Sequence, residues 1–303
     1  PPVAPPETGS SWASRRSLAA AVAAATPLRP QPTHAMWQLW HPADMLDYVE
    51  RYGRDGDAAS VLAAMDRAAE TSWMMNMGPE KGALLEEAFR GRRRILEIGT
   101  FLGYMSVRLA SKMPADGTLV TVEKDAVNYD AARVVLRKAL PEDTLRRVRM
   151  LHADARDLLL TSSSSTSVGG GPALARGPRG KFDAVLMDHW KPDYATDLGL
   201  LVANGLLEDG ALVVADNVLF PGAPELLDAL AVPYVASHDA VSGMPCLRVD
   251  ETSTERLGGD EQDVDVAYYR SRDFETHLVP AAFEYRPETP DAMSVSRYLG
   301  RRR

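Results

Sequence analysis

Five short apolar runs alternate with longer amphipathic segments, and this alternation constrains the fold more than any other feature of the chain. The runs are "RRILEIG" (93–99), "GTLVTVEK" (117–124), "RVRMLHAD" (147–154), "KFDAVLMD" (181–188) and "GALVVADN" (210–217). Most are rich in Val, Ile and Leu, which is typical of buried parallel strands. Segments with helical periodicity, such as 104–113 and 127–140, follow the first four. The order predicts βαβ units and a doubly wound α/β fold.

The amino-acid composition and net charge indicate which kinds of molecule the protein binds. The 303 residues are 45% hydrophobic, which suits one sizeable domain with extensions. A formal net charge of -8 argues against nucleic acid, whose binders usually carry a clustered basic surface. Cys246 is the only cysteine, so neither an internal disulfide nor a C-x-x-C site is possible. No apolar run reaches the roughly 18 to 20 residues of a membrane span. We therefore expect a small-molecule partner, no nucleic acid, no membrane span and a monomer.

Low-complexity segments divide the chain. Residues 1–43 hold eight prolines and one acid, a composition that fits either an organelle transit segment or a disordered linker. We expect a single domain over 44–303, with a Gly/Ser-rich insert at 161–180 and a polar insert at about 238–272. The chain begins without methionine, so it reads as a piece of a longer product. The predicted location is cytoplasmic, or organellar if the first segment is a transit sequence.

The ends of the first two predicted strands point to a nucleoside ligand. Gly99 and Gly103 in "EIGTFLGY" allow a tight turn that a ligand can approach, and Glu123 ends the second strand. A carboxylate there can accept both ribose hydroxyls. Both features also occur as an ordinary strand-to-helix turn and an ordinary strand-end acid. The turn lacks the G-x-G-x-x-G that cradles a pyrophosphate, which favours S-adenosylmethionine (SAM) over a dinucleotide.

The ends of the fourth and fifth strands carry oxygen ligands. Asp188 ends one strand, and Asp216 and Asn217 end the next. Adjacent strands lie about 4.8 Å apart, so these three side chains converge. Two carboxylates and an amide oxygen suit Mg²⁺ better than Zn²⁺. Lys191 follows Asp188 by three residues, and a nearby cation with partial burial would lower its pKa towards that of a general base. The alternative is a solvated surface lysine.

Four longer stretches resemble catechol O-methyltransferase, a family of class I SAM-dependent methyltransferases. They are "SVLAAMDRAAETSWMMNMG", "ILEIGTFLGYMSVRLA", "FDAVLMDHWKPDY" and "LVVADNVLFPGAPELL", and the match runs from about residue 45 to 230. A further piece, "FETHL...FEYRP", resumes it near the C-terminus. The resemblance implies a Rossmann-like, seven-stranded, mainly parallel sheet with helices on both faces. It also implies Mg²⁺-dependent transfer of a methyl group from SAM to one hydroxyl of a catechol.

The resemblance assigns roles to individual residues. Lys191 is the implied catalytic base. Asp188, Asp216 and Asn217 are the implied metal ligands. The implied substrate contacts are Trp73, Asp188, Lys191, Asn217, Pro221 and Glu284. The implied SAM-binding positions are Met75, Met77, Gly78, Glu97, Gly99, Phe101, Met105, Glu123, Lys124, Ala155, Arg156, Asp188, His189 and Trp190.

Five of these positions depart from the family pattern. The family has a tyrosine at Phe101, a serine at Met105 and a Ser-Gln pair at Ala155–Arg156, and Lys124 is also altered. Each lost hydrogen bond is worth roughly 0.5 to 1.5 kcal/mol, so the sequence predicts weaker SAM binding beside an intact metal centre. Two other functions stay open. One is another metal-dependent phenolic O-methyltransferase, and the other is a binding protein that keeps the fold without catalysis.

Overall fold

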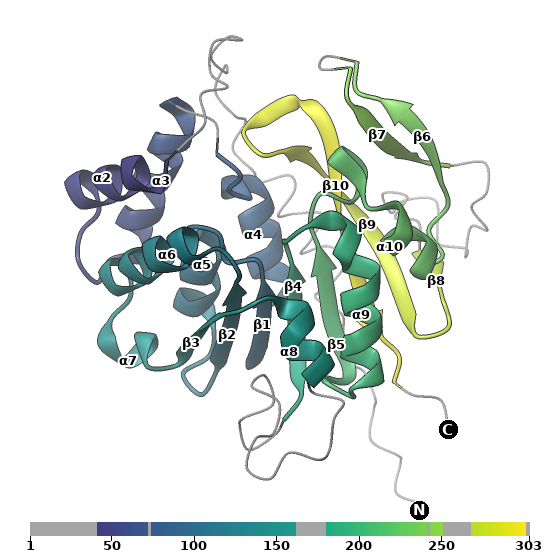
Figure 1. Ribbon diagram of the computed structural model, residues 1–303, viewed down its shortest axis with the longest axis horizontal. Coiled ribbons are helices and arrows are strands. Elements are labelled where there is room, and N and C mark those ends of the chain that lie inside the picture. Colours follow the sequence, from purple (N-terminus) through teal and green to yellow (C-terminus); the bar gives the residue numbers. More distant parts are fainter. Residues whose placement is uncertain (1–40, 72–73, 162–179, 241–242, 251–267, 301–303) are drawn as a thin grey trace, which may run out of the picture.

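Ten strands form two sheets in the computed structural model, which describes residues 41–71, 74–161, 180–240, 243–250 and 268–300. The strands are β1 (Arg94–Ile98), β2 (Thr118–Glu123), β3 (Val148–His152), β4 (Phe182–Met187), β5 (Leu207–Ala215), β6 (Tyr234–His238), β7 (Pro245–Val249), β8 (Tyr268–Arg270), β9 (Phe274–Phe283) and β10 (Arg286–Tyr298). The main sheet has the order β3-β2-β1-β4-β5-β10-β9-β8, and β6 and β7 form a separate pair (Figure 1).

The predicted fold class is confirmed, with one strand more than expected. All five apolar runs of the sequence form parallel strands, β1 to β5. The strands β8, β9 and β10 add an antiparallel edge. Seven strands were predicted, and the eighth is β8, whose three residues pair with the edge of β9. A three-residue strand has too short a pattern to be recognised in a sequence.

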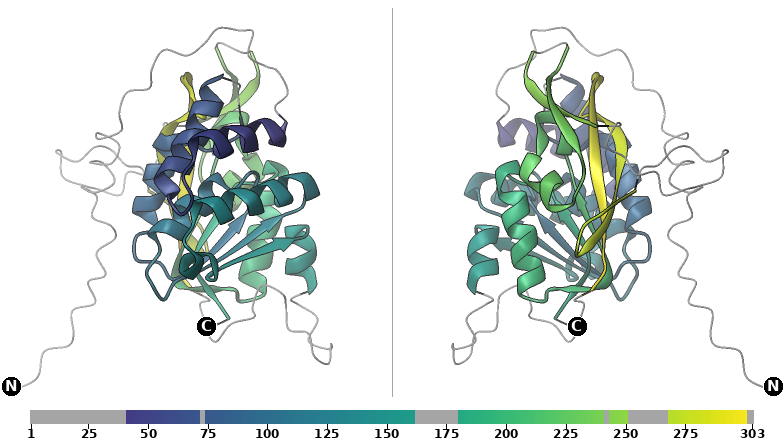
Figure 2. Two further views of the ribbon diagram at one scale, coloured as in Figure 1. Left: turned by 90° about the vertical axis from the view of Figure 1, so that its left-hand side faces the viewer. Right: turned by 90° about the vertical axis from the view of Figure 1, so that its right-hand side faces the viewer.

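Helices cover both faces of the main sheet. The first group consists of α2 (Pro42–Tyr52), α3 (Ala58–Thr71), α4 (Gly78–Ala88), α5 (Tyr104–Lys112), α6 (Ala126–Ala139) and α7 (Glu142–Leu145). The second group consists of α8 (Ala155–Thr161), α9 (Tyr194–Ala203) and α10 (Pro224–Ala229). The two side views show helices on both sides of the main sheet (Figure 2). The first group packs on one apolar core and the second group on the other. No described helix is long and apolar enough to cross a membrane.

The five parallel strands, β1 to β5, send side chains into two apolar cores. On β1, Ile95 belongs to the core under α2–α6, whereas Leu96 and Ile98 belong to the core under α8–α10. Side chains of a strand alternate between faces, so a buried strand needs apolar residues at nearly every position. The two-sided burial explains why the five runs are continuously apolar in the sequence.

The strand order reverses between β1 and β4, and the candidate site lies at the ends of these strands. Here Gly99 has a φ of 96°, which only glycine adopts readily. A Cβ atom at this position would lie 2.3 Å from the backbone oxygen of Asp188. The glycine therefore lets the chain leaving β1 pass directly beside the end of β4.

The two predicted inserts differ in how much of them is described. Nearly all of the Gly/Ser-rich insert, 162–179, lies outside the described residues. The polar insert predicted at about 238–272 begins within β6 and contains β7 and β8, while 241–242 and 251–267 also lie outside. The domain limits at 44 and 303 stay predictions.

Candidate active site

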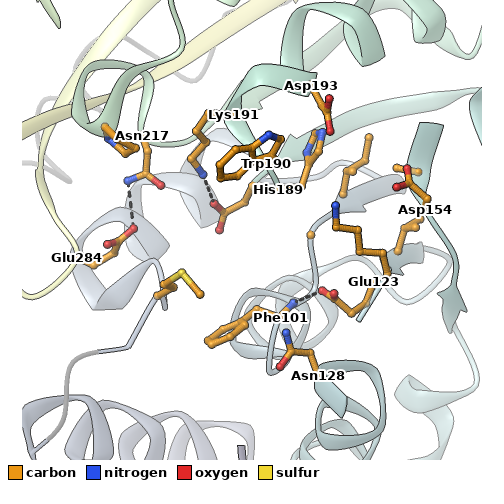
Figure 3. Close-up of a pocket in the computed structure, with 18 of the residues that line it drawn as sticks. Phe101, Glu123, Asn128, Asp154, His189, Trp190, Lys191, Asp193, Asn217 and Glu284 are labelled. Carbon is orange, nitrogen blue, oxygen red and sulfur yellow. Dashed lines mark hydrogen bonds and ion pairs between the residues drawn. The ribbon is translucent and has the colours of Figure 1, made fainter. Parts of the chain in front are cut away.

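A pocket of about 510 Å³ opens at the ends of β1, β2, β4 and β5. One end is lined by Glu123, Asn128 and Asp154 and the other by Asn217 and Glu284, with His189 and Trp190 between them (Figure 3). A crevice at the carboxyl ends of parallel strands, where the strand order reverses, is the usual ligand site of a doubly wound sheet.

Glu123 is held at the end of β2 by two backbone groups. Its Oε2 accepts from the backbone N–H of Phe101 and its Oε1 from that of Asp125, both at 2.8 Å. Asp125 in turn caps α6 by accepting from the N–H groups of Val127 and Asn128. Each carboxylate oxygen has a second lone pair, so Glu123 can still accept from the two hydroxyls of a ribose.

Asp216 and Asn217 follow β5, beside Asp188, which follows the neighbouring strand β4. Asn217 has a left-handed backbone conformation with φ 57°, which asparagine tolerates better than most residues. Its side-chain Nδ2 donates to Glu284 Oε1 at 3.1 Å and to Asp291 Oδ2 at 3.0 Å. With the amide nitrogen turned towards two carboxyl groups, the Asn217 Oδ1 oxygen is the atom left to bind a cation.

A buried ion cluster supports these ligands from behind. Lys81, in the first turn of α4, lies 2.8 Å from Asp216 Oδ1 and 2.6 Å from Asp291 Oδ2, and all three side chains are almost completely buried. Burial opposes the lysine charge, but Asp216 and Asp291 outweigh it and hold the pKa of Lys81 far above its usual value. Asp291 also accepts from the backbone N–H groups of Leu219 and Phe220. The cluster therefore fixes both Asp216 and the turn after it.

Lys191 points at Asp188 from the short η2 helix (Lys191–Asp193), with Nζ 3.1 Å from Asp188 Oδ1 (Figure 3). Burial alone would lower its pKa, but Tyr194, Asp188 and Asp216 together hold the pKa of Lys191 well above its ordinary value. The lowered pKa expected from the sequence needs a cation that offsets those two carboxylates. Burial also raises the pKa of Asp188, and the neighbouring Lys191 only partly offsets this.

Glu284 completes this end of the pocket from the turn between β9 and β10. Burial raises the pKa of its carboxyl group to about 8, because Lys81 only partly offsets burial and the charge of Asp216. Its Oε2 atom is buried without a hydrogen-bond partner. A protonated Glu284 can therefore donate one hydrogen bond to an oxygen of a ligand in the pocket.

Most residues expected at the site line this pocket. They are Met75, Gly99, Phe101, Glu123, Lys124, Ala155, Asp188, His189, Trp190, Lys191, Asn217, Pro221 and Glu284. Met77, Gly78, Glu97, Met105, Arg156 and Asp216 are not among the lining residues, and Trp73 lies outside the described residues. The Arg156 guanidinium pairs with Asp193, which lines the pocket, and with the buried Asp197 of α9. Glu97 is completely buried and accepts from Ser106. The roles assigned to these residues stay predictions.

Several lining or supporting residues were not identified from the sequence. Asp154 and Asn128 lie near Glu123, and the position of Asp154 after β3 is a signal that could have revealed it. Lys81 and Asp291 come from α4 and β10, far from Asp216 in the chain. Phe283 and Met244 also line the pocket. No local pattern marks a buried lysine or a distant partner of this kind.

The oxygen donors of Asp188, Asp216 and Asn217 suit a divalent cation. Asp216 Oδ2 is buried without a hydrogen-bond partner, and Asn217 Oδ1 lies opposite its engaged nitrogen. Both are hard oxygen donors of the kind that Mg²⁺ prefers. Among the described residues, no group of three or more His, Cys, Asp or Glu side chains could hold a metal ion. The donor set of Asp188, Asp216 and Asn217 contains only two such side chains, because its third donor is an amide.

Comparisons with known proteins identify the family to which the chain belongs. The O-methyltransferase family model matches residues 59–231, more than half of the chain. Catechol O-methyltransferase B of Danio rerio is 32% identical over 190 residues, which cover 62% of this chain and 67% of that protein. A probable O-methyltransferase of Mycobacterium tuberculosis is 36% identical over 186 residues, 60% of this chain and 75% of the relative. The corresponding match to mouse catechol O-methyltransferase spans 65% of that relative.

Solved structures show the same fold. The O-methyltransferase of Bacillus cereus, solved with SAH, has a TM-score of 0.52 at 16% identity and covers 83% of this chain and 90% of its own. TomG of Streptomyces achromogenes, solved with SAM, has a TM-score of 0.50 at 24% identity and covers 86% and 97%. The fold and pocket thus define a class I methyltransferase. The chain belongs to the O-methyltransferase family and is similar to its catechol O-methyltransferases.

Proposed function

We propose that the protein transfers a methyl group from SAM to one hydroxyl of a catechol in a Mg²⁺-dependent reaction. The observation that carries the proposal is the arrangement of Asp188, Asp216 and Asn217 at the ends of adjacent strands, with the Lys191 amine 3.1 Å from Asp188. Three oxygen donors beside a base suit an acceptor with two neighbouring hydroxyls. The similarity to catechol O-methyltransferases supports the same acceptor class.

The bound groups would supply charge and the methyl group. Mg²⁺ held by Asp188, Asp216 and Asn217 would make a catechol hydroxyl more acidic, and SAM would provide an electrophilic methyl group. Protein side chains would transfer the proton and orient the acceptor. Lys191 accepts the hydroxyl proton, and Glu284 donates a hydrogen bond to the second oxygen. Trp190 and Pro221 line the pocket and would hold the acceptor ring in a fixed orientation.

Glu123 anchors the SAM ribose in the proposed reaction, and Glu123→Gln is expected to weaken SAM binding. Hydrogen bonds to a charged group are worth about 1.5 to 3 kcal/mol, so the Kd should rise between about tenfold and a hundredfold. Calorimetric titration with SAM measures this directly. Glu142→Gln on the exposed α7 is the control and should leave the Kd unchanged. An unaltered Kd in a folded Glu123→Gln protein would contradict the assignment.

The proposed function is tested by transfer of a labelled methyl group from SAM to unsubstituted catechol. We expect transfer in Mg²⁺, loss of transfer in EDTA, and recovery when Mg²⁺ is added back in excess. Transfer only to larger phenolics with neighbouring oxygens would favour a different O-methyltransferase. Measurable SAM binding without transfer to any acceptor would support the non-catalytic alternative. Transfer that persists in EDTA would contradict the role of the metal.

A further inference from the structure

The β6–β7 hairpin packs onto the end of the pocket that holds Asn217 and Glu284. Cys246 of β7 forms a buried apolar cluster with Phe220 and Phe283. The two phenylalanine rings meet edge to face with centroids 4.7 Å apart, and both residues line the pocket. The hairpin is therefore a wall behind the predicted acceptor position.

Leu247 of β7 packs the same hairpin against the turn after β5. A Cβ atom at Gly222 would lie 2.9 Å from Leu247 Cγ, so the hairpin side chain packs directly on this backbone. Gly222 ends η3 (Val218–Gly222), the segment that follows Asn217 and carries Pro221. The hairpin thus packs on the segment that follows the predicted metal ligand and carries the predicted ring contact.

Met244, in the connection between β6 and β7, is a residue of the hairpin that lines the pocket. It lies just before β7, where the N–H of Asp239 donates to its backbone oxygen at 2.8 Å, and its side chain lines the pocket while staying 46% exposed. Met75 and Trp190 also line the pocket and are 57% and 65% exposed. The three residues come from separate segments of the chain and line the same pocket. Exposed apolar surface gathered at a pocket is typical of a binding site.

We infer that Met244 and the β6–β7 hairpin form a subsite for an apolar substituent on the ring of the acceptor. The inference rests on the proposed function and names the acceptor class more closely: a catechol with an alkyl or similarly apolar side chain. Methionine suits such a subsite, because its flexible side chain adapts to ligands of varied shape.

The test compares kcat/KM for 4-butylcatechol, unsubstituted catechol and 3,4-dihydroxybenzoate. Each fully buried methylene is worth about 0.8 kcal/mol, roughly a fourfold factor, so a partly buried butyl chain should give a preference of about tenfold or more over catechol. Met244→Ser should reduce this preference to about threefold or less, mainly through a higher KM for 4-butylcatechol.

Val235→Ser is the matched control. Val235 lies on β6 of the same hairpin and is 48% exposed, but it is not among the lining residues. Its variant should keep the wild-type preference. Equal kcat/KM values for 4-butylcatechol and catechol, a preference for 3,4-dihydroxybenzoate, or equal losses in the two variants would each overturn the subsite. Failure to methylate unsubstituted catechol would instead overturn the proposed function.

Discussion

Replacing Lys191 with methionine is expected to lower kcat for catechol methylation by about 10² to 10⁴, the usual contribution of a positioned general base. The methionine side chain keeps the length of lysine but cannot accept a proton. Lys191 Nζ lies 3.1 Å from Asp188 Oδ1 and is mostly buried, so no other described amine takes its place beside that carboxylate. Single-turnover methyl transfer measures the loss without interference from product release.

A proton acceptor and a packing residue would respond differently to pH. If Lys191 accepts the proton, alkaline solution should partly restore the rate of Lys191→Met, because hydroxide can then replace the amine. The SAM Kd should stay within about twofold, since the residue serves the acceptor. Lys112→Met, at the exposed end of α5, is the control and should keep the wild-type rate. A kcat within threefold of wild type would rule out Lys191 as the base.

Lys81→Met is expected to lower the free energy of unfolding by about 3 to 5 kcal/mol, the usual cost of removing one partner of a buried ion pair. The change leaves the buried carboxyl groups of Asp216, Asp291 and Glu284 without their common cation. Urea unfolding in EDTA, followed by fluorescence, measures the effect in the absence of any added metal.

Lys138→Met provides a matched comparison. Lys138 also contacts two acids, Asp55 at 2.8 Å and Glu50 at 3.3 Å, but both acids are largely exposed. Surface pairs of this kind contribute about 0 to 1 kcal/mol. Similar losses in the two variants would show that burial of the Lys81 cluster does not matter. A larger loss in Lys81→Met would show that the buried cluster stabilises the fold more than the exposed ion pairs do.

The sequence predicted those parts of the molecule whose signal is local. A buried parallel strand needs apolar residues on both faces, so β1 to β5 stand out as continuous runs. Since parallel strands share one carboxyl edge, Asp188 and Asp216 could be placed together from the sequence alone. Gly99 was also recognisable as the glycine of a tight turn after a strand, and the structure adds that a Cβ atom there would clash with the backbone after β4.

Contacts between residues that are distant in the sequence could not be predicted, because no local pattern indicates them. Lys81 and Asp291 meet across 210 positions of the chain, and neither α4 nor β10 carries a pattern that indicates a buried charge. The β6–β7 pair falls at the start of a segment whose polar composition suggested only an insert. Arg156 follows a strand end, as a ligand contact would, yet its guanidinium forms ion pairs with Asp193 and Asp197, about 40 positions further along the chain. Each of these features depends on which distant side chains the fold brings together.

Catalysis in the proposed reaction depends most directly on two neighbouring oxygens being bound at one metal site. The decisive measurement compares methyl transfer to 1,2-dihydroxybenzene and to its 1,3 isomer, at equal concentrations of enzyme, SAM and Mg²⁺. The two acceptors have nearly the same size and polarity, so only the spacing of their hydroxyls differs. We predict a kcat/KM for the 1,2 isomer about a hundredfold higher or more, and loss of this difference in EDTA. Equal transfer to both isomers, or a difference that survives EDTA, would contradict binding of the two oxygens at one metal.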